Sequence, residues 1–200
     1  MKGSIFVVSF FAAGVLAGIA GVIPNIIVEG DFSFYALCAL MFCVGISIGS
    51  DADSFKKFSM LDRRLMLLPF LTIAGTLAGC AVANFFLNDR SLSECLAIGS
   101  GMGYYSLSSI FITEYKGVEP GTVALLANIM REITTLLCAP LLARYFGRLA
   151  PISAGGATSM DTTLPIIVSS SGNEYAIVSV YHGFVTDFSV PFLVTLFCTI

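Results

Sequence analysis

Arg131 and Glu132 stand side by side in a run from Thr122 to Phe146 that is otherwise almost wholly apolar. On a membrane helix that begins near Gly121, Glu132 would lie roughly 15 Å along the axis, close to the bilayer centre. A carboxylate at that depth costs about 2.5–3.5 kcal/mol even on the most lenient scale, so it must face a cavity or a partner. The pattern indicates binding of a cation or a proton, with a structural glutamate neutralised by another helix as the alternative.

Two further polar residues, Asn128 and Thr135, share a helix face with Glu132, because they come four residues before it and three after it. Arg131 points about 100° away on the helix wheel, so adjacency in sequence does not make it the partner of Glu132. We expect Asn128, Arg131 and Glu132 to contribute to a substrate or ion site. For Arg131, the alternative is an ion pair with an acid elsewhere.

A second acid, Asp161, lies in GGATSMDTTLP (Gly155–Pro165), between a glycine pair and a proline. A carboxylate at a helix break inside the membrane can bind a cation or take up a proton, and we expect that role for Asp161. The nearby hydroxyls of Thr158 and Ser159 have a structural alternative, which is to cap a half-helix.

His182 and Asp187 are five residues apart, so on one helix they point in different directions. His182 is a candidate proton relay or a hydrogen-bonded core histidine. Asp187 either lines a cavity or makes a helix-packing bond. Tyr104 and Tyr105, in the glycine-rich stretch GSGMGYYSLSS, are candidates for contact with a solute, although small residues also merely pack membrane helices.

Composition places these residues in a lipid bilayer. The chain is 56% hydrophobic and 12% charged with a mean hydropathy of +0.91, which a water-soluble surface cannot accommodate. A net charge of -3, without a clustered basic face, excludes nucleic acid as a partner. All cysteines lie in apolar runs without metal-ligand spacing, so we expect no disulfide, metal or other cofactor: Cys38, Cys43, Cys80, Cys95, Cys138 and Cys198.

The apolar runs predict membrane helices of about 20 residues, the length that spans a hydrocarbon core of about 30 Å. Two other segments, Ser91–Ile112 and Gly155–Gly172, are dense in Gly, Ser and Thr, so we expect them to be broken or re-entrant and to enter from opposite sides. The full crossings are predicted at Ser4–Ile23, Phe32–Ser50, Leu65–Leu87, Gly121–Phe146 and Tyr175–Ile200.

Charge sets the predicted orientation, because basic loops remain cytoplasmic. Four basic residues place the loop 51–64, and with it the N-terminus, inside. The acidic flanks of Ser91–Ile112 suit the outer face, which leaves the C-terminus outside. We expect one all-α domain over residues 1–200, a polytopic transmembrane helix bundle with two broken or re-entrant segments.

Three blocks are familiar in their order and spacing: GSGMGYYSLSSIFITE (Gly99–Glu114), ANIMREITTLLCAPLL (Ala127–Leu142) and GGATSMDTTLP, followed by HGF at His182–Phe184. Together they resemble the bacterial lysine exporter family, the LysO type. The resemblance implies export of L-lysine and its analogues across the inner membrane, a cation/proton antiporter-like architecture, and Glu132 as the essential acid. It also implies site roles for Gly101, Gly103, Tyr105, Ser106, Ser108, Thr158, Ser159 and Asp161.

Full-length family members carry further helices before the first one here. The resemblance therefore implies that this chain is the larger, C-terminal portion of a split transporter. A separate small membrane protein would supply the missing helices, unless a homodimer substitutes. An acid at Asp187 is not expected of the family, so its role rests on the membrane argument alone.

The expected function is export of L-lysine coupled to protons or sodium, without enzymatic activity. One alternative is an ion-coupled transporter of another small solute on the same architecture. An intramembrane hydrolase would need a serine–histidine pair or two facing aspartates, for which Ser106 with His182 and Asp161 with Asp187 are candidates. A membrane subunit that transports nothing is a third alternative, and it predicts that removal of Glu132 changes no flux.

Overall fold

The computed structural model describes residues 13, 14, 16–21, 35, 64–87 and 90–200. The chain forms two units, Met1–Ile46 and Ser47–Ile200. In the first unit, residues 13, 14 and 16–19 are helical. The predicted crossings Ser4–Ile23 and Phe32–Ser50 and the loop 51–64 lie wholly or largely outside the described residues.

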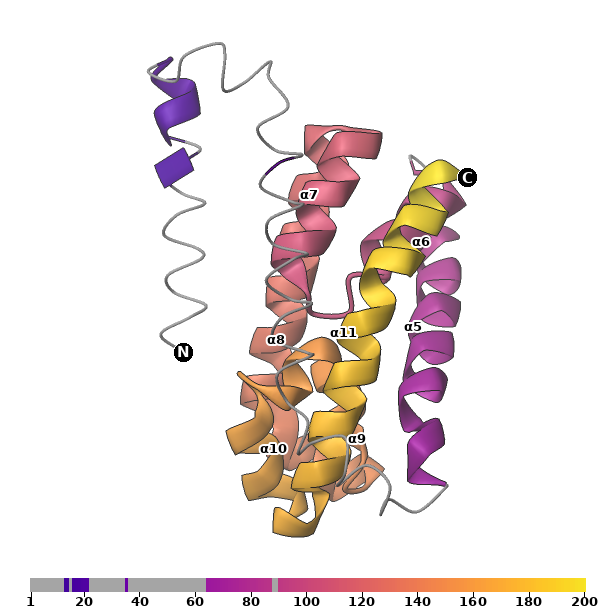
Figure 1. Cartoon of the computed structure of the whole chain (residues 1–200), viewed down its shortest axis with the longest axis vertical. Helices are drawn as coiled ribbons and strands as arrows, with labels where there is room; N and C mark the ends of the chain where they lie inside the picture. Colours follow the sequence, from indigo (N-terminus) through magenta and orange to yellow (C-terminus); the bar gives the residue numbers. More distant parts are fainter. Residues whose placement is uncertain (1–12, 15, 22–34, 36–63, 88–89) are drawn as a thin grey trace. The chain divides into compact units, whose positions relative to one another are not determined.

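Three helices of the second unit are long and apolar enough to cross a membrane, with 20, 29 and 27 residues. Every regular element in the described part of the chain is helical, which confirms the all-α class. The three long apolar helices predicted for this part are also confirmed (Figure 1). They consist of η1 (Leu65–Leu67) with α5 (Leu68–Asn84), of α8 (Val118–Phe146), and of η3 (Asn173–Tyr175) with α11 (Ala176–Thr199).

The first broken segment is a hairpin of two short helices, α6 (Leu92–Gly99) and α7 (Tyr105–Lys116). These 8 and 12 residues reach only about 12 and 18 Å, so neither helix crosses the hydrocarbon core. Arg90, just before α6, forms an ion pair with Glu119 in the first turn of α8 at 2.6 Å. Both arms of this first hairpin therefore begin at the same end of the unit (Figure 1).

The second broken segment is a hairpin built from α9 (Ala150–Gly155), η2 (Gly156–Met160) and α10 (Leu164–Ser171). An ion pair between Arg148 and Glu174 at 2.8 Å closes its base. The bases of the two hairpins are separated by the whole length of α8, because Glu119 lies in its first turn and Arg148 follows its last. The two hairpins thus enter from opposite ends, and the two predicted broken segments are confirmed.

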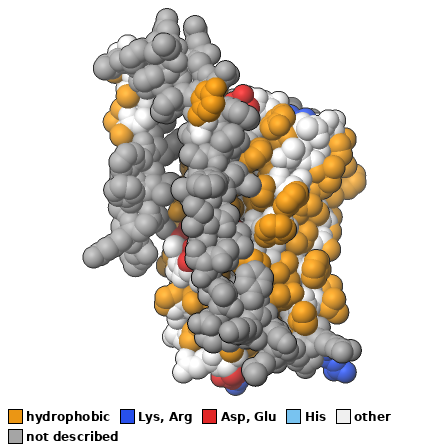
Figure 2. Space-filling model, in the orientation of Figure 1, with side chains coloured by type: hydrophobic (Ala, Val, Ile, Leu, Met, Phe, Trp, Pro, Cys, Tyr) orange, Lys and Arg blue, Asp and Glu red, His pale blue; other side chains and the backbone are white. Residues whose placement is uncertain are grey.

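The outer surface of the second unit is apolar. Large hydrophobic side chains of α5 and α8, among them Phe70, Leu71, Met130 and Leu137, are 57%, 66%, 66% and 73% exposed. Figure 2 shows hydrophobic side chains over the flank of the described surface and charged ones mostly at its two ends. A bilayer around this flank would face apolar side chains, as a membrane protein requires.

The cysteines of the described residues are free thiols. Cys95 and Cys198 are buried, and Cys80 and Cys138 are half-buried. The remaining two, Cys38 and Cys43, lie outside the described residues.

Candidate functional site

The tips of the two hairpins touch. The amide of Ala157 donates a hydrogen bond to the carbonyl of Met102 at 2.9 Å. Glycine permits this approach, because Gly156 has a φ of 61° and a Cβ there would overlap the Met102 carbonyl. Opposite it, Gly103 has a φ of 99°, and a Cβ there would lie 3.2 Å from the carbonyl of Gly155. The irregular backbone of each hairpin tip thus finds a hydrogen-bond partner in the other tip. Non-helical backbone at membrane depth requires such a partner within the protein.

Asn128 of α8 holds the turn of the first hairpin. Its Oδ1 accepts a hydrogen bond from the amide of Gly103 at 2.7 Å, and its Nδ2 donates to the carbonyl of Ala124 at 2.8 Å and to the hydroxyl of Ser108 at 3.3 Å. A Cβ on Gly101 would overlap this amide. Four expected site residues, Asn128, Gly101, Gly103 and Ser108, therefore lie together, and their contacts fix the turn.

Arg131 holds the second hairpin. Its Nε and one Nη donate to the carbonyls of Ala154 and Ser153, both at 2.9 Å, at the end of α9. The other Nη lies 3.5 Å from the hydroxyl of Thr76 on α5. The last carbonyls of a helix lack partners within it and carry its negative dipole end, so a guanidinium satisfies both needs. These contacts give Arg131 a positioning role between α8, α9 and α5.

A chain of buried polar side chains joins the second hairpin to α11 and α5. Nδ1 of His182 lies 3.1 Å from the hydroxyl of Ser159, and Nε2 lies 2.9 Å from that of Thr72. The Thr72 hydroxyl donates to the hydroxyl of Ser153 at 3.0 Å. Ser159 and Ser179 also exchange hydroxyl-to-carbonyl hydrogen bonds at 3.0 and 2.7 Å. This network packs η2 against α11.

The Ser159–His182 contact also bears on the hydrolase alternative. Both side chains are 0% exposed, and the second ring nitrogen of His182 faces a threonine instead of a carboxylate. The Ser159 hydroxyl further contacts the carbonyls of Gly156 and Ser179. Ser106, the serine expected from the sequence, is half-buried in the first turn of α7. The geometry favours helix packing over a nucleophile and its base.

Thr158 closes the turn between α9 and α10. Its hydroxyl donates to the carbonyl of Gly155 at 2.9 Å and lies 3.2 Å from the hydroxyl of Thr163. Thr163 in turn donates to the carbonyl of Thr158 at 2.9 Å. These bonds give Thr158 a structural contact, although neither η2 nor α10 has a side-chain cap, and they precede Asp161 directly.

Glu132 lies in the interior at 1% exposure. Asn128 and Thr135, on the same face of α8, are 3% and 0% exposed, so this polar stripe is covered by protein. Glu132 interacts electrostatically with Tyr105 at the start of α7. The carboxylate thus lies within reach of the turn of the first hairpin.

Asp161 and Asp187 form a second acidic locus. Asp161 is exposed, and its carboxylate accepts hydrogen bonds from the amide and hydroxyl of Thr162 at 2.5 and 3.3 Å. Asp187, on α11, is 7% exposed. Both carboxylates interact electrostatically with Tyr104, and with each other. Sequence reasoning left Asp187 outside the expected site, although an acid in a membrane helix was the signal.

The acids Glu132, Asp161 and Asp187 therefore all interact electrostatically with the tyrosine pair at the turn of the first hairpin. Carboxylates and phenol hydroxyls suit ammonium groups and small cations. The N-terminus of α7 begins at the same turn without a side-chain cap, so its amides suit an anion. In the described residues, membrane-length helices and two opposed hairpins are the architecture of a multi-pass membrane protein.

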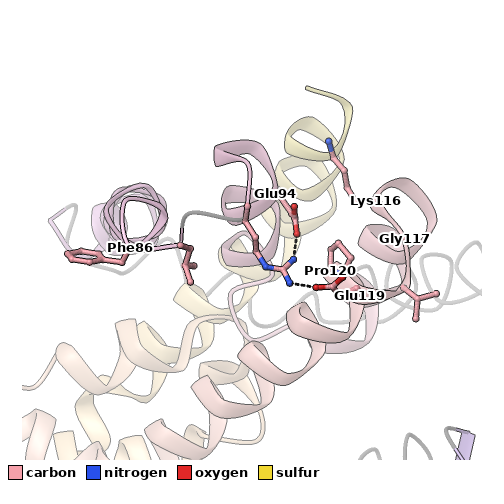
Figure 3. A pocket seen from close by; sticks show the side chains of 9 residues that line it. Phe86, Glu94, Lys116, Gly117, Glu119 and Pro120 are labelled. Atoms are coloured by element: carbon pink, nitrogen blue, oxygen red, sulfur yellow. Dashed lines mark hydrogen bonds and ion pairs between the residues drawn. The ribbon is translucent and has the colours of Figure 1, made fainter.

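A separate pocket of about 630 Å³ opens at the base of the first hairpin (Figure 3). There Arg90 bridges Glu94 and Glu119, and the hydrogen bond with Glu94 raises the pKa of Arg90, so the guanidinium remains charged. The three acids of the site are not among its lining residues, which are Phe86, Leu87, Arg90, Glu94, Lys116, Gly117, Val118, Glu119 and Pro120.

Comparison with known proteins identifies the family. The family described as Lysine exporter LysO matches residues 8–198, and the chain belongs to it. It is 34% identical over 167 residues to the lysine exporter LysO of Escherichia coli K12, covering 84% of this chain but only about half, 55%, of that relative. It is also 34% identical over 165 residues to a putative lysine exporter of Haemophilus influenzae Rd, covering 82% and 83%. No solved structure matches the chain.

Proposed function

We propose that this chain exports L-lysine from the cytoplasm across the inner membrane, coupled to the movement of protons or sodium. The observation that carries the proposal is the gathering of three carboxylates around one hairpin turn, in a member of this family. Lysine carries two ammonium groups and one carboxylate, so a site with excess negative charge suits it. Toxic analogues that keep both ammonium groups, such as thialysine, would follow the same route.

Each charge of the substrate has a matching group in this site. Glu132 and Asp161 would bind an ammonium group or the coupling ion. The uncapped N-terminus of α7 would receive the carboxylate, because its free amides and positive dipole end favour an anion.

The remaining polar residues would position these groups. Asn128 fixes the first turn, and Arg131 fixes the end of α9. His182 joins η2 to α5. Opposed hairpins that meet near the membrane centre are a common way for secondary transporters to expose one site alternately to the two sides.

The lengths of the relatives bear on whether the chain acts with a partner protein. The match covers 55% of the Escherichia coli exporter and 83% of the Haemophilus influenzae protein. A separate small membrane protein that supplies further helices, or a second copy of the chain, would complete the transporter. Copurification of a second polypeptide, or a dimer by crosslinking in membranes, tests this part of the proposal.

Efflux of labelled lysine from proteoliposomes that contain the purified chain, together with any polypeptide that copurifies with it, tests the function. We expect efflux above that of empty liposomes. A proton or sodium gradient should stimulate this efflux when it is imposed in one direction and not when it is reversed. Glu174→Gln, which removes an exposed ion pair at the base of the second hairpin, is the control and should export normally. If active preparations move other solutes but never lysine, the chain is an ion-coupled transporter of a different substrate.

A further inference from the structure

Asp187 is a buried carboxylate to which the described residues donate no hydrogen bond and offer no cation. Its electrostatic neighbours are another acid, Asp161, and the phenol of Tyr104. The adjacent hydroxyl of Thr186 is also buried, at 0% exposure, without a hydrogen-bond partner among the described residues. Burial of an uncompensated charge is costly, so a ligand that binds here is expected to bring the missing positive charge.

A close backbone contact holds the two acids together. A Cβ on Gly183 would lie 2.6 Å from the amide nitrogen of Met160, so α11 packs directly on η2 at this point. Asp187 lies one helical turn beyond Gly183 on the same face of α11. Asp161 directly follows Met160. The contact between Gly183 and Met160 therefore sets both carboxylates beside the same junction.

The third acid, Glu132, lies on a different helix, α8. Glu132 interacts with Tyr105, Asp187 interacts with Tyr104, and Asp161 interacts with both tyrosines. The two tyrosines are adjacent, so one hairpin turn connects two anionic loci. A diamino acid carries two ammonium groups on one carbon chain, and a monoamino acid of the same length carries only one.

We propose that Asp187, together with Asp161 and the Tyr104 hydroxyl, binds one ammonium group of a diamino-acid substrate, while Glu132 binds the other. This inference rests on the proposed function and adds a specificity-determining residue to it. Asp187 then favours lysine over a solute with a single ammonium group, because such a solute would leave one of the two acidic loci without a positive charge.

The test compares lysine with norleucine, which has the same chain length but no side-chain ammonium. In proteoliposomes, Asp187→Asn should raise the half-saturating lysine concentration about tenfold or more, the usual effect of losing one charge-assisted hydrogen bond. The maximal rate should change less, and the preference for lysine over norleucine should fall by a similar factor. Asp187→Glu should retain most of the preference, and Glu174→Gln should behave as the unmodified chain.

Unchanged half-saturation and preference in Asp187→Asn would overturn the inference while leaving the proposed function intact. Loss of stimulation by the ion gradient, with an unchanged half-saturating lysine concentration, would assign Asp187 to the coupling ion and also overturn it. If Asp187→Asn does not insert, Asp187→Leu takes its place, because leucine removes the buried carboxylate altogether. The same changes in half-saturating lysine concentration and in preference over norleucine are then expected. An unmodified chain that moves no lysine, even when it is reconstituted with any polypeptide that copurifies with it, would refute the proposed function itself.

Discussion

The carbonyl of Met102 accepts a hydrogen bond from the amide of Ala157 at 2.9 Å, and this bond joins the tips of two hairpins that enter from opposite ends. The two residues are far apart in sequence, yet glycines on both sides of the contact permit it. Asp161 lies on the second hairpin, and Glu132 and Asp187 lie on the long helices α8 and α11. The integrity of the contact between the tips is therefore the first property to test.

Gly156→Ala should destabilise the protein more than Gly147→Ala. Both glycines have a positive φ, of 61° and 92°, in a backbone region that only glycine readily adopts, so each alanine costs about 1–3 kcal/mol. Only the Cβ at position 156 overlaps the Met102 carbonyl, because nothing lies within 4 Å of one at position 147. Thermal unfolding in detergent measures the difference. Equal melting temperatures for the two variants would show that the tips do not depend on this contact.

Glu132→Gln should abolish lysine export while the protein still inserts. Glutamine preserves the shape and most of the hydrogen bonding but removes the charge that would bind a cation or a proton. Flux assays in proteoliposomes, together with the amount of inserted protein, measure this effect. Export at the normal rate by the glutamine variant would exclude the carboxylate as a binding group.

Arg131→Lys should loosen the second hairpin. A lysine ammonium cannot reproduce the forked donation of the guanidinium to the carbonyls of Ser153 and Ala154. We expect faster hydrogen exchange over α9 and η2, with the first hairpin little changed. Arg144→Lys, at an exposed position of α8, is the matched control. If exchange in α9 is the same in both variants, Arg131 does not hold this hairpin.

Cysteine labelling should place the two hairpin bases on opposite sides of the membrane. In a cysteine-free background, Val118→Cys should react with an impermeant reagent from outside, and Tyr145→Cys from the cytoplasm. Both positions are well exposed, at 72% and 69%. Labelling of both from one side would contradict opposed hairpins, and an exchange of the two sides would invert the orientation predicted from basic loops.

Hydropathy predicted the long helices of the described part because a membrane helix needs only a sufficient apolar run. Glycine, serine and threonine density also predicted the two broken segments, since an irregular backbone at membrane depth needs small residues and local hydroxyls. Two predicted hairpin ends were wrong: α7 runs past the predicted end Ile112 to Lys116, and α9 begins at Ala150, before the predicted start Gly155.

The hydrogen-bond partners of the site residues could not be predicted from the sequence. Asn128 holds Gly103, 25 positions away, and Arg131 holds Ala154, 23 positions away. Such contacts depend on how the hairpins dock, which no local periodicity encodes. Asp187 was undecided for the same reason, since the close packing of Gly183 on Met160 determines which residue it faces.

The short arms of the hairpins have a consequence for biogenesis. Arms of 6 to 12 residues are too short for the insertion machinery to recognise as membrane segments, whereas the three long helices meet the length requirement. We therefore expect the long helices to partition into lipid first and the hairpins to enter afterwards, into a bundle that offers Asn128, Arg131 and Thr72 as hydrogen-bonding partners. On this order the acidic site assembles late, and a chain that stalls before it would be inserted, apolar on its outside, and inactive.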